Sequence, residues 1–179
     1  MNLQPVPMLK TERLILRAPR LEDFPAHFIM WSDPRTVRYF DGHSYSEEDS
    51  WLRFVRNHGQ WLLFGFGNWG IEEKASGLYI GSIGFFLAKR PLTGPWRDDP
   101  EAGWVIAPDH HGKGYAREAM AAAMAWADAH IEAPQTWCMI NRGNEISVKV
   151  AERAGYREFG PADYKGSPVR IFTRPRATS

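Results

Sequence analysis

The chain has 179 residues, 44% of them hydrophobic and 24% charged, which predicts one soluble globular domain spanning residues 1–179. Its formal net charge of +1 gives no support for a nucleic-acid partner, and because no stretch approaches the ~20 apolar residues that span a bilayer, we expect no membrane partner. Cys138 is the only cysteine, which excludes an internal disulfide framework and favours a reducing, cytoplasmic location.

The first half of the chain predicts a strand and two helices, followed by a hairpin. "RLILRAP" alternates apolar and polar residues and predicts a strand over 13–19. Helical spacing predicts a helix over 20–33 and another that begins after an N-cap at Ser46 and ends at Gly59. The glycine-rich aromatic stretch that follows predicts an antiparallel hairpin of 65–73 and 78–88 around the turn "EKASG".

The second half predicts a strand-helix-strand unit. After a proline-rich loop over 89–100, "EAGWVIAP" predicts a strand over 101–107. An alanine-rich helix over 112–133 presents small residues along one side, which lets it approach a sheet closely, and "TWCMI" predicts a buried strand over 136–140. The two strands would run parallel through a right-handed crossover, so the fold class is α/β.

The chain ends with a helix and a hairpin. "NEISVKVAERAG" predicts a helix with Asn144 near its N-cap and Gly155 after its end, and "YREFGPADYKGSPVRIFT" predicts the final hairpin.

The segment "HGKGYA", residues 111–116, joins the strand 101–107 to the alanine-rich helix. The first turn of a helix has free N–H groups and a partial positive charge, and glycines at 112 and 114 leave this backbone open to a phosphate or diphosphate. Lys113 adds a charge there or faces solvent. The segment fits neither the P-loop nor the dinucleotide-binding pattern, so an ordinary strand-to-helix turn stays open as the alternative.

Three segments in order share a known pattern. "HGKGYA" fits [QR]-x-x-G-x-[GA], with His111 where Arg or Gln is usual, and "INRGNEISVKVAERAGYRE" fits N-x-x-S-x-x-[VL]-x-x-x-x-G-[FY]. With the opening "LKTERLILRAPRLEDFP", they resemble the GCN5-related N-acetyltransferase (GNAT) superfamily, and the opening resembles its RimJ/RimL-type branch, which modifies ribosomal-protein N-termini and small amines. The resemblance runs from about Thr11 to the final hairpin.

The resemblance implies a mixed, mostly antiparallel sheet, flanked by helices, with two splayed parallel central strands and a bulge in the earlier one. Acetyl-CoA would lie in the V between them, with its diphosphate on the backbone amides of His111, Gly112, Lys113, Gly114, Tyr115 and Ala116. The pantetheine would contact backbone groups near Trp104, Val105 and Ile106. Asn144 matches a position that contacts the cofactor in relatives, although it serves equally well as a helix cap.

The expected chemistry is attack of a free amine on a thioester, which needs a proton acceptor. Glu101 is the candidate general base, against the alternative of a solvated edge carboxylate, and backbone N–H groups around residue 106 are candidates for the oxyanion. Many relatives carry a tyrosine acid where this chain has Ala151. Ser147 resembles the serine of the RimJ/RimL-type branch, against the alternative of simple helix packing. With no paired Cys/His nucleophile, direct attack in a ternary complex is favoured.

The acceptor groove is expected among the least regular segments, 24–46, 61–69 and 89–100. Six aromatic residues are candidates for its lining: Phe24, Trp31, Tyr39, Phe40, Trp69 and Trp96. Such a groove suits a partly apolar small-molecule amine or a peptide N-terminus better than a polyamine. A non-catalytic acyl-CoA-binding module is the alternative function. We expect no metal site, because the adjacent side chains of His110 and His111 point apart. The protein is expected to be either a monomer or a homodimer.

Overall fold

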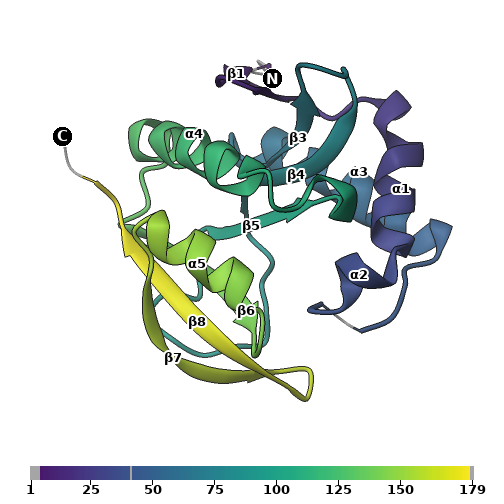
Figure 1. Ribbon diagram of the computed structural model, residues 1–179. Helices are drawn as coiled ribbons and strands as arrows, with labels where there is room; N and C mark the ends of the chain where they lie inside the picture. The colour runs from purple at the N-terminus through teal and green to yellow at the C-terminus, as the bar shows by residue number, and fades with distance from the viewer. Residues whose placement is uncertain (1–4, 41, 178–179) are drawn as a thin grey trace.

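The computed structural model describes residues 5–40 and 42–177. Its centre is an eight-stranded sheet in the order β1-β2-β3-β4-β5-β6-β8-β7, with helices on both faces (Figure 1). The strands are β1 (Leu9–Lys10), β2 (Leu14–Arg17), β3 (Asn68–Glu73), β4 (Tyr79–Phe86), β5 (Glu101–Ile106), β6 (Gln135–Asn141), β7 (Arg157–Tyr164) and β8 (Ser167–Pro175). The helices are α1 (Phe24–Ser32), α2 (Pro34–Val37), α3 (Glu47–Phe64), α4 (Tyr115–His130) and α5 (Glu145–Arg153).

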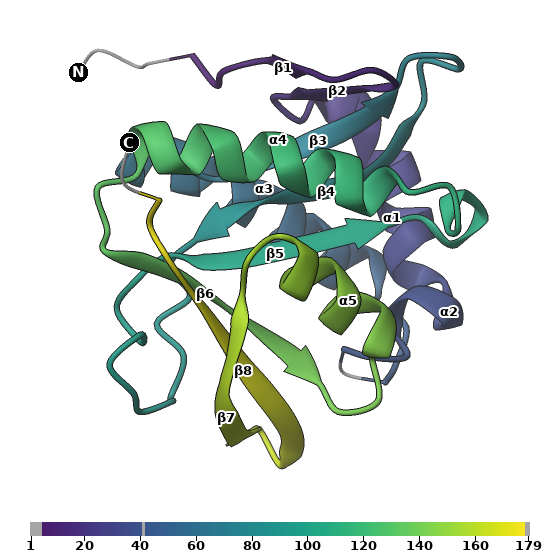
Figure 2. The same cartoon turned by 60° about the vertical axis from the view of Figure 1, so that its left-hand side comes forward.

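The sheet is antiparallel except between β5 and β6, and the expected α/β fold class is confirmed. These two strands share one register pair, Glu101 with Trp137, and then diverge. Figure 2 shows α4 and α5 on one side of the sheet and α1 and α3 on the other. The prediction of a bulge in β5, the earlier of the two parallel strands, is wrong, because its six pairs with β4, from Gly81–Ile106 to Phe86–Glu101, keep one register. A register shift occurs instead between Ile71 and Glu72 of β3.

Helix α3 is longer than the sequence pattern predicts. Ser46 caps it as expected, with its Oγ accepting the Asp49 amide at 3.1 Å, but the helix continues through Gly59 to Phe64. A glycine costs a helix interior only about 1 kcal/mol relative to alanine. The last turn recovers this cost by packing Trp61 against the sheet, where its Nε1 donates to the Asn68 carbonyl at 2.9 Å.

The side of α4 that faces the sheet consists of small residues and methionines. Ala119, Ala123 and Ala127 are at most 3% exposed, and they pack into the main core with strands on both sides of the β5–β6 junction. Short side chains let the helix axis approach the sheet closely, as the alanine pattern predicts. The helix thereby fixes the position of the turn before Tyr115. Among the residues that the structure describes, no helix is long and apolar enough to cross a membrane.

Candidate active site

A cavity of about 850 Å³ opens where β5 and β6 part. Its walls come from α3, β4, β5, the end of β6, the start of α5 and the β7–β8 turn. Polar and charged residues of α3 line it together with aromatic residues from α1 and from the segment after α2. The site is therefore assembled from both halves of the sheet.

Glu101 lines this cavity and lies at the one pair that β5 shares with β6. It is 4% exposed, and Arg90 donates to both its oxygens, from Nε to Oε2 at 2.7 Å and from Nη2 to Oε1 at 2.9 Å. Burial raises the pKa of Glu101 above its ordinary value, although the hydrogen bonds and charge of Arg90 oppose that shift. The alternative of a solvated edge carboxylate is therefore wrong, because this carboxylate is buried and paired with Arg90.

The peptide groups of β5 alternate between its two neighbours. Ala107 N donates to Ile80 O on the β4 side at 2.8 Å, and Trp137 N of β6 donates to Pro100 O at 3.1 Å. Even-numbered residues of β5 therefore direct their N–H and C=O groups toward β6. Because β6 pairs with β5 at Glu101 only, the groups of later even-numbered residues face the gap between the two strands. This places the backbone of Trp104 and Ile106 on the cavity side.

The prediction for Val105 is wrong for its backbone, because its peptide groups pair with β4. Its side chain instead joins Met30 and Trp31 in a small apolar cluster and forms part of the cavity wall.

The turn that precedes α4 has open backbone amides. Gly112 and Gly114 adopt positive φ angles of 77° and 81°, which glycine accommodates without strain. The amides of Gly112, Lys113 and Gly114 have no hydrogen-bond partner among residues 5–40 and 42–177, and the first-turn amides of Tyr115 and Ala116 have no intrahelical partner either. Bare amides at the N-terminus of a sixteen-residue helix are a suitable site for an anion.

His111 is the exception in this turn. Its amide donates to Pro108 O at 3.1 Å within a 3₁₀ turn. The prediction that this amide is open to a ligand is therefore wrong. Its side chain bends back, and Nε2 lies 2.7 Å from Ile106 O. A histidine here thus ties the turn to the end of β5.

Arg13 holds the same turn from the other side. Its Nη1 donates to Lys113 O at 2.9 Å, and its Nε donates to Glu118 of α4 at 2.7 Å. Thr11 also donates to Glu118, at 2.6 Å. The turn therefore depends on a segment about one hundred residues away in sequence.

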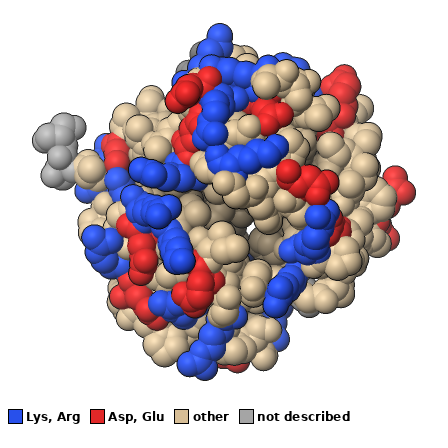
Figure 3. Space-filling model, in the orientation of Figure 1, with Lys and Arg blue, Asp and Glu red and all other residues tan. Residues whose placement is uncertain are grey.

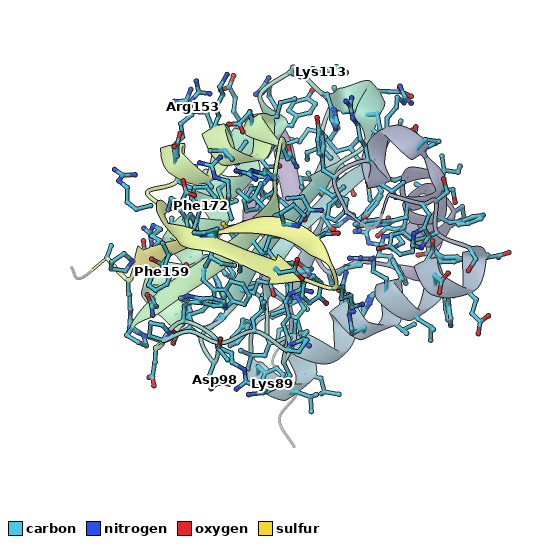
Figure 4. The ribbon with its side chains drawn as sticks, turned by 90° about the horizontal axis from the view of Figure 1, so that it is seen from below. Lys89, Asp98, Lys113, Arg153, Phe159 and Phe172 are labelled. Carbon is cyan, nitrogen blue, oxygen red and sulfur yellow. The ribbon has the colours of Figure 1, made fainter. Side chains whose placement is uncertain are left out.

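Basic side chains gather near this end of the molecule. Figure 3 shows a hollow in the middle of the face that carries α5, with Lys and Arg side chains on both sides of it. In Figure 4, Lys113 and Arg153 lie at one edge of the molecule, while Lys89 and Asp98, an ion pair of 3.1 Å, lie at the opposite edge. Asp and Glu side chains lie among these basic groups in Figure 3, so the charge around the hollow is of both signs.

Asn144 and Ser147 both line the cavity at the start of α5. Asn144 Oδ1 accepts the Ser147 amide at 3.2 Å, so Asn144 caps the helix, as the structural alternative predicts. Ala151, one turn later, is fully buried against the core. The Ser147 hydroxyl, for which the structure gives no hydrogen bond within the described chain, is the polar group on this helix nearest the cavity.

The six aromatic candidates divide into two groups. Trp31, Tyr39 and Phe40 line the cavity, as expected. The other three do not, and the prediction for them is wrong: Phe24, Trp69 and Trp96. Trp69 is 0% exposed and packs edge-on against two other tryptophans, and Trp96 is 2% exposed and packs against the Trp137 ring at 4.5 Å. Phe24 packs edge-on against the Trp51 and Phe54 rings of α3.

Three arginines in the cavity wall are absent from the expectations: Arg53, Arg56 and Arg90. Arg53 and Arg56 lie on α3, and the sequence pattern assigns them no role in the site. Arg90 lies in the loop after β4, eleven residues before its partner Glu101. No local signal in the sequence distinguishes these arginines from others.

Comparison with known proteins matches residues 13–157 to the Acetyltransferase (GNAT) domain family. A solved acetyltransferase from Agrobacterium tumefaciens is 30% identical, with a TM-score of 0.80 over 95% of each chain. YoaA of Bacillus subtilis, an N-acetyltransferase, is 25% identical over 86% of this chain and 85% of its own length. RimL, a ribosomal L7/L12 α-N-protein acetyltransferase solved with coenzyme A, is 16% identical, with a TM-score of 0.74 over 94% of this chain and 98% of its own.

Proposed function

The chain belongs to the Acetyltransferase (GNAT) domain family and is an N-acetyltransferase, and on that premise we propose that it transfers an acetyl group from acetyl-CoA to a primary amine. The acceptor would be a peptide or protein N-terminus or a small-molecule amine. The amine would attack the thioester directly while both substrates are bound. Burial raises the pKa of the Cys138 thiol well above its ordinary value, so this thiol is a poor candidate for a covalent intermediate.

The backbone hydrogen-bonding groups beside the gap between β5 and β6 fit coenzyme A. The open amides of Gly112, Lys113 and Gly114, with those of Tyr115 and Ala116 at the helix start, would hold the diphosphate. Trp104 would present its backbone groups to the pantetheine in the manner of an added strand. The Ile106 carbonyl is paired with His111, so its N–H is the group that would donate to the developing oxyanion. When bound, the thioester supplies the electrophilic carbonyl carbon.

The acceptor's ammonium group must lose a proton before its nitrogen can attack the thioester, and Glu101 would accept that proton. Burial raises the pKa of Glu101 above the ordinary value, which makes the carboxylate a stronger base. Two of its lone-pair directions stay available, because Arg90 occupies one site on each oxygen. Ser147 and Asn144, on the opposite wall, would orient the sulfur and the pantetheine end.

One juxtaposition supports this mechanism most directly. The buried carboxylate of Glu101 lies where the two parallel strands part, in the same cavity as the Trp104 backbone and Ser147. A proton acceptor, a strand edge for the donor and a polar group for the leaving thiolate thus share one space.

The likeness to RimL supports placing the chain near the RimJ/RimL-type branch, together with its opening sequence and Ser147. We also propose a cytoplasmic location, in agreement with its single, buried thiol, and leave a monomer and a homodimer as alternatives.

The test combines binding with turnover. CoA titration followed by backbone NMR should shift the amide resonances of Gly112, Gly114 and Trp104, and incubation with acetyl-CoA and an amine panel should release free CoA. Unmoved resonances in the turn would overturn the donor site. Binding without thiol release across α-amines and small amines would overturn the transferase mechanism and favour a CoA-binding module.

A further inference from the structure

The cavity carries more positive than negative charge. Among the described residues that line it, four are Lys or Arg and two are Asp or Glu: Arg53, Arg56, Arg90, Lys165, Asp49 and Glu101. Arg90 holds Glu101 by two hydrogen bonds, and the charge of Glu101 also acts on Arg53 and Arg56, although it forms an ion pair with neither of them. Asp49 accepts the Ser46 hydroxyl at 2.7 Å and the structure gives it no ion pair. Arg53 and Arg56 therefore have no carboxylate partner in the part of the chain that the structure describes.

Arg53 is held in a fixed orientation. Its guanidinium lies 3.9 Å from the centre of the Trp31 ring and 5.0 Å from that of Tyr45, and its Nη2 donates to the Tyr45 hydroxyl at 3.0 Å. Stacking on two rings positions the planar fork and leaves most of its five donors for another acceptor. A preorganised arginine of this kind suits a carboxylate or phosphate.

Arg56, one turn along α3, faces the same space. The structure gives it no ion pair or hydrogen bond to a described residue. Burial, with the like charges of Arg53 and Arg90, lowers the pKa of Arg56. Arg56 is an exposed residue, and the nearby like charges of Arg53 and Arg90 cost free energy that a bound anion would relieve.

From this geometry we propose that the acceptor carries an anionic group beside its amine, as an amino acid does, and that Arg53 and Arg56 bind that group. The proposal rests on the transferase function above. With the anion on α3, the amine is directed toward Glu101, and Trp31, Tyr39 and Phe40 contact its apolar part. A polyamine, which adds positive charge to the cavity, is a poor acceptor for the same reason.

The experiment compares two acceptors that share the ring and the α-amino group but differ in the charge beside that amine. Phenylalanine and phenylalaninamide have the same ring and the same α-amine, but only the first has a carboxylate. Thiol release should give a kcat/KM for phenylalanine about tenfold or more above that for the amide, the size of one charge-assisted hydrogen bond. The intrinsic chemistry opposes this result, because the carboxylate makes the neighbouring amine more basic and so less often free.

Two variants locate the effect. Arg56→Gln and Arg53→Gln should each lower kcat/KM for phenylalanine about tenfold and change that for the amide by less than about twofold. Arg97→Gln is the matched control, because this exposed arginine lies in the loop 89–100 outside the cavity and should leave both values unchanged. Equal rates for the two acceptors in the wild type, or equal losses on both in the variants, would overturn the proposal.

A binding measurement separates this proposal from the transferase mechanism. Calorimetric titration with N-acetylphenylalanine should show binding that weakens with salt and is lost in Arg56→Gln, and the corresponding amide should bind more weakly. Equal binding of acid and amide would overturn the anion site even if no amine in the panel is acetylated. Release of CoA with neutral amines only would leave the transferase standing and remove the anion preference.

Discussion

Arg90 donates to both carboxylate oxygens of Glu101, over 2.7 and 2.9 Å, and so holds the one buried acid of the cavity in a single orientation. The pair joins a loop after β4 to the first residue of β5. Arg90 also lies with its guanidinium 4.7 Å from the Tyr164 ring of β7, so the ion pair lies between the two halves of the sheet.

Replacing Glu101 with glutamine should lower kcat by about 10²- to 10³-fold, because the amide cannot accept the proton from the amine. In the wild type, activity should fall as the pH drops through the pKa of Glu101, which burial raises, and this acid limb should be absent from the variant. The measurement is the pH–rate profile from thiol release. CoA affinity should change by less than about twofold, and an unchanged rate would remove Glu101 from the mechanism.

Replacing Arg90 with methionine should destabilise the fold by about 2–3 kcal/mol at pH 7.5, because it leaves a buried carboxylate unpaired. The pKa of Glu101 would then rise further, since its opposing charge is gone. A raised carboxyl pKa destabilises the ionised form only, so the loss should shrink as the pH falls through that pKa. Urea unfolding at pH 7.5 and 5.5 checks this, with Arg97→Gln as the control; a pH-independent loss would contradict it.

Replacing Gly114 with alanine should lower stability by about 1 kcal/mol and weaken CoA binding about tenfold. A Cβ at this position meets only Arg13 Nη2, at 3.5 Å, so the cost arises from the φ of 81° and not from crowding. Gly59→Ala is a matched control, because Gly59 lies within α3 with open space around its Cβ. That substitution should raise stability by about 0.5–1 kcal/mol, and a loss there would contradict the helix assignment.

Acidification should destabilise the protein through His27. Burial, together with the charge of Arg53, lowers the pKa of this histidine from 6.5 to about 4, and it is 1% exposed. Between those values the unfolded chain binds the proton and the folded chain does not, so stability falls as the pH decreases. The loss from pH 7 to pH 5 should be about 2 kcal/mol. His27→Gln should show a shallower pH dependence in the same unfolding series, whereas an identical dependence would assign the effect to other groups.

The sequence was sufficient to predict the turn before α4 and the strands around it. Two glycines before an alanine-rich helix indicate an open helix N-terminus, and the structure has one there. Such features depend on neighbouring residues, so local patterns identify them. Gly59 shows the limit even of local rules, since a helix passes through it when packing outweighs propensity.

The arrangement within the cavity could not be predicted in the same way. Arg90 and Glu101 meet because the loop 89–100 folds back onto β5, and nothing in either residue's neighbourhood indicates that contact. Likewise, Trp31 and Trp69 occur in similar aromatic stretches and are both at most 3% exposed, yet only Trp31 lines the cavity. Composition identifies aromatic residues, but only the three-dimensional packing decides which of them meet a substrate.

The hydrogen bonds that Arg13 donates to the Lys113 carbonyl and to Glu118 affect how the chain folds during synthesis. During synthesis the N-terminal strands leave the ribosome about one hundred residues before the turn that they brace. The brace is thus available when the glycine turn emerges, whereas an excised fragment that starts at β5 would present the same motif with nothing to hold its shape. Peptides cut from this region should therefore bind diphosphates far more weakly than the full chain.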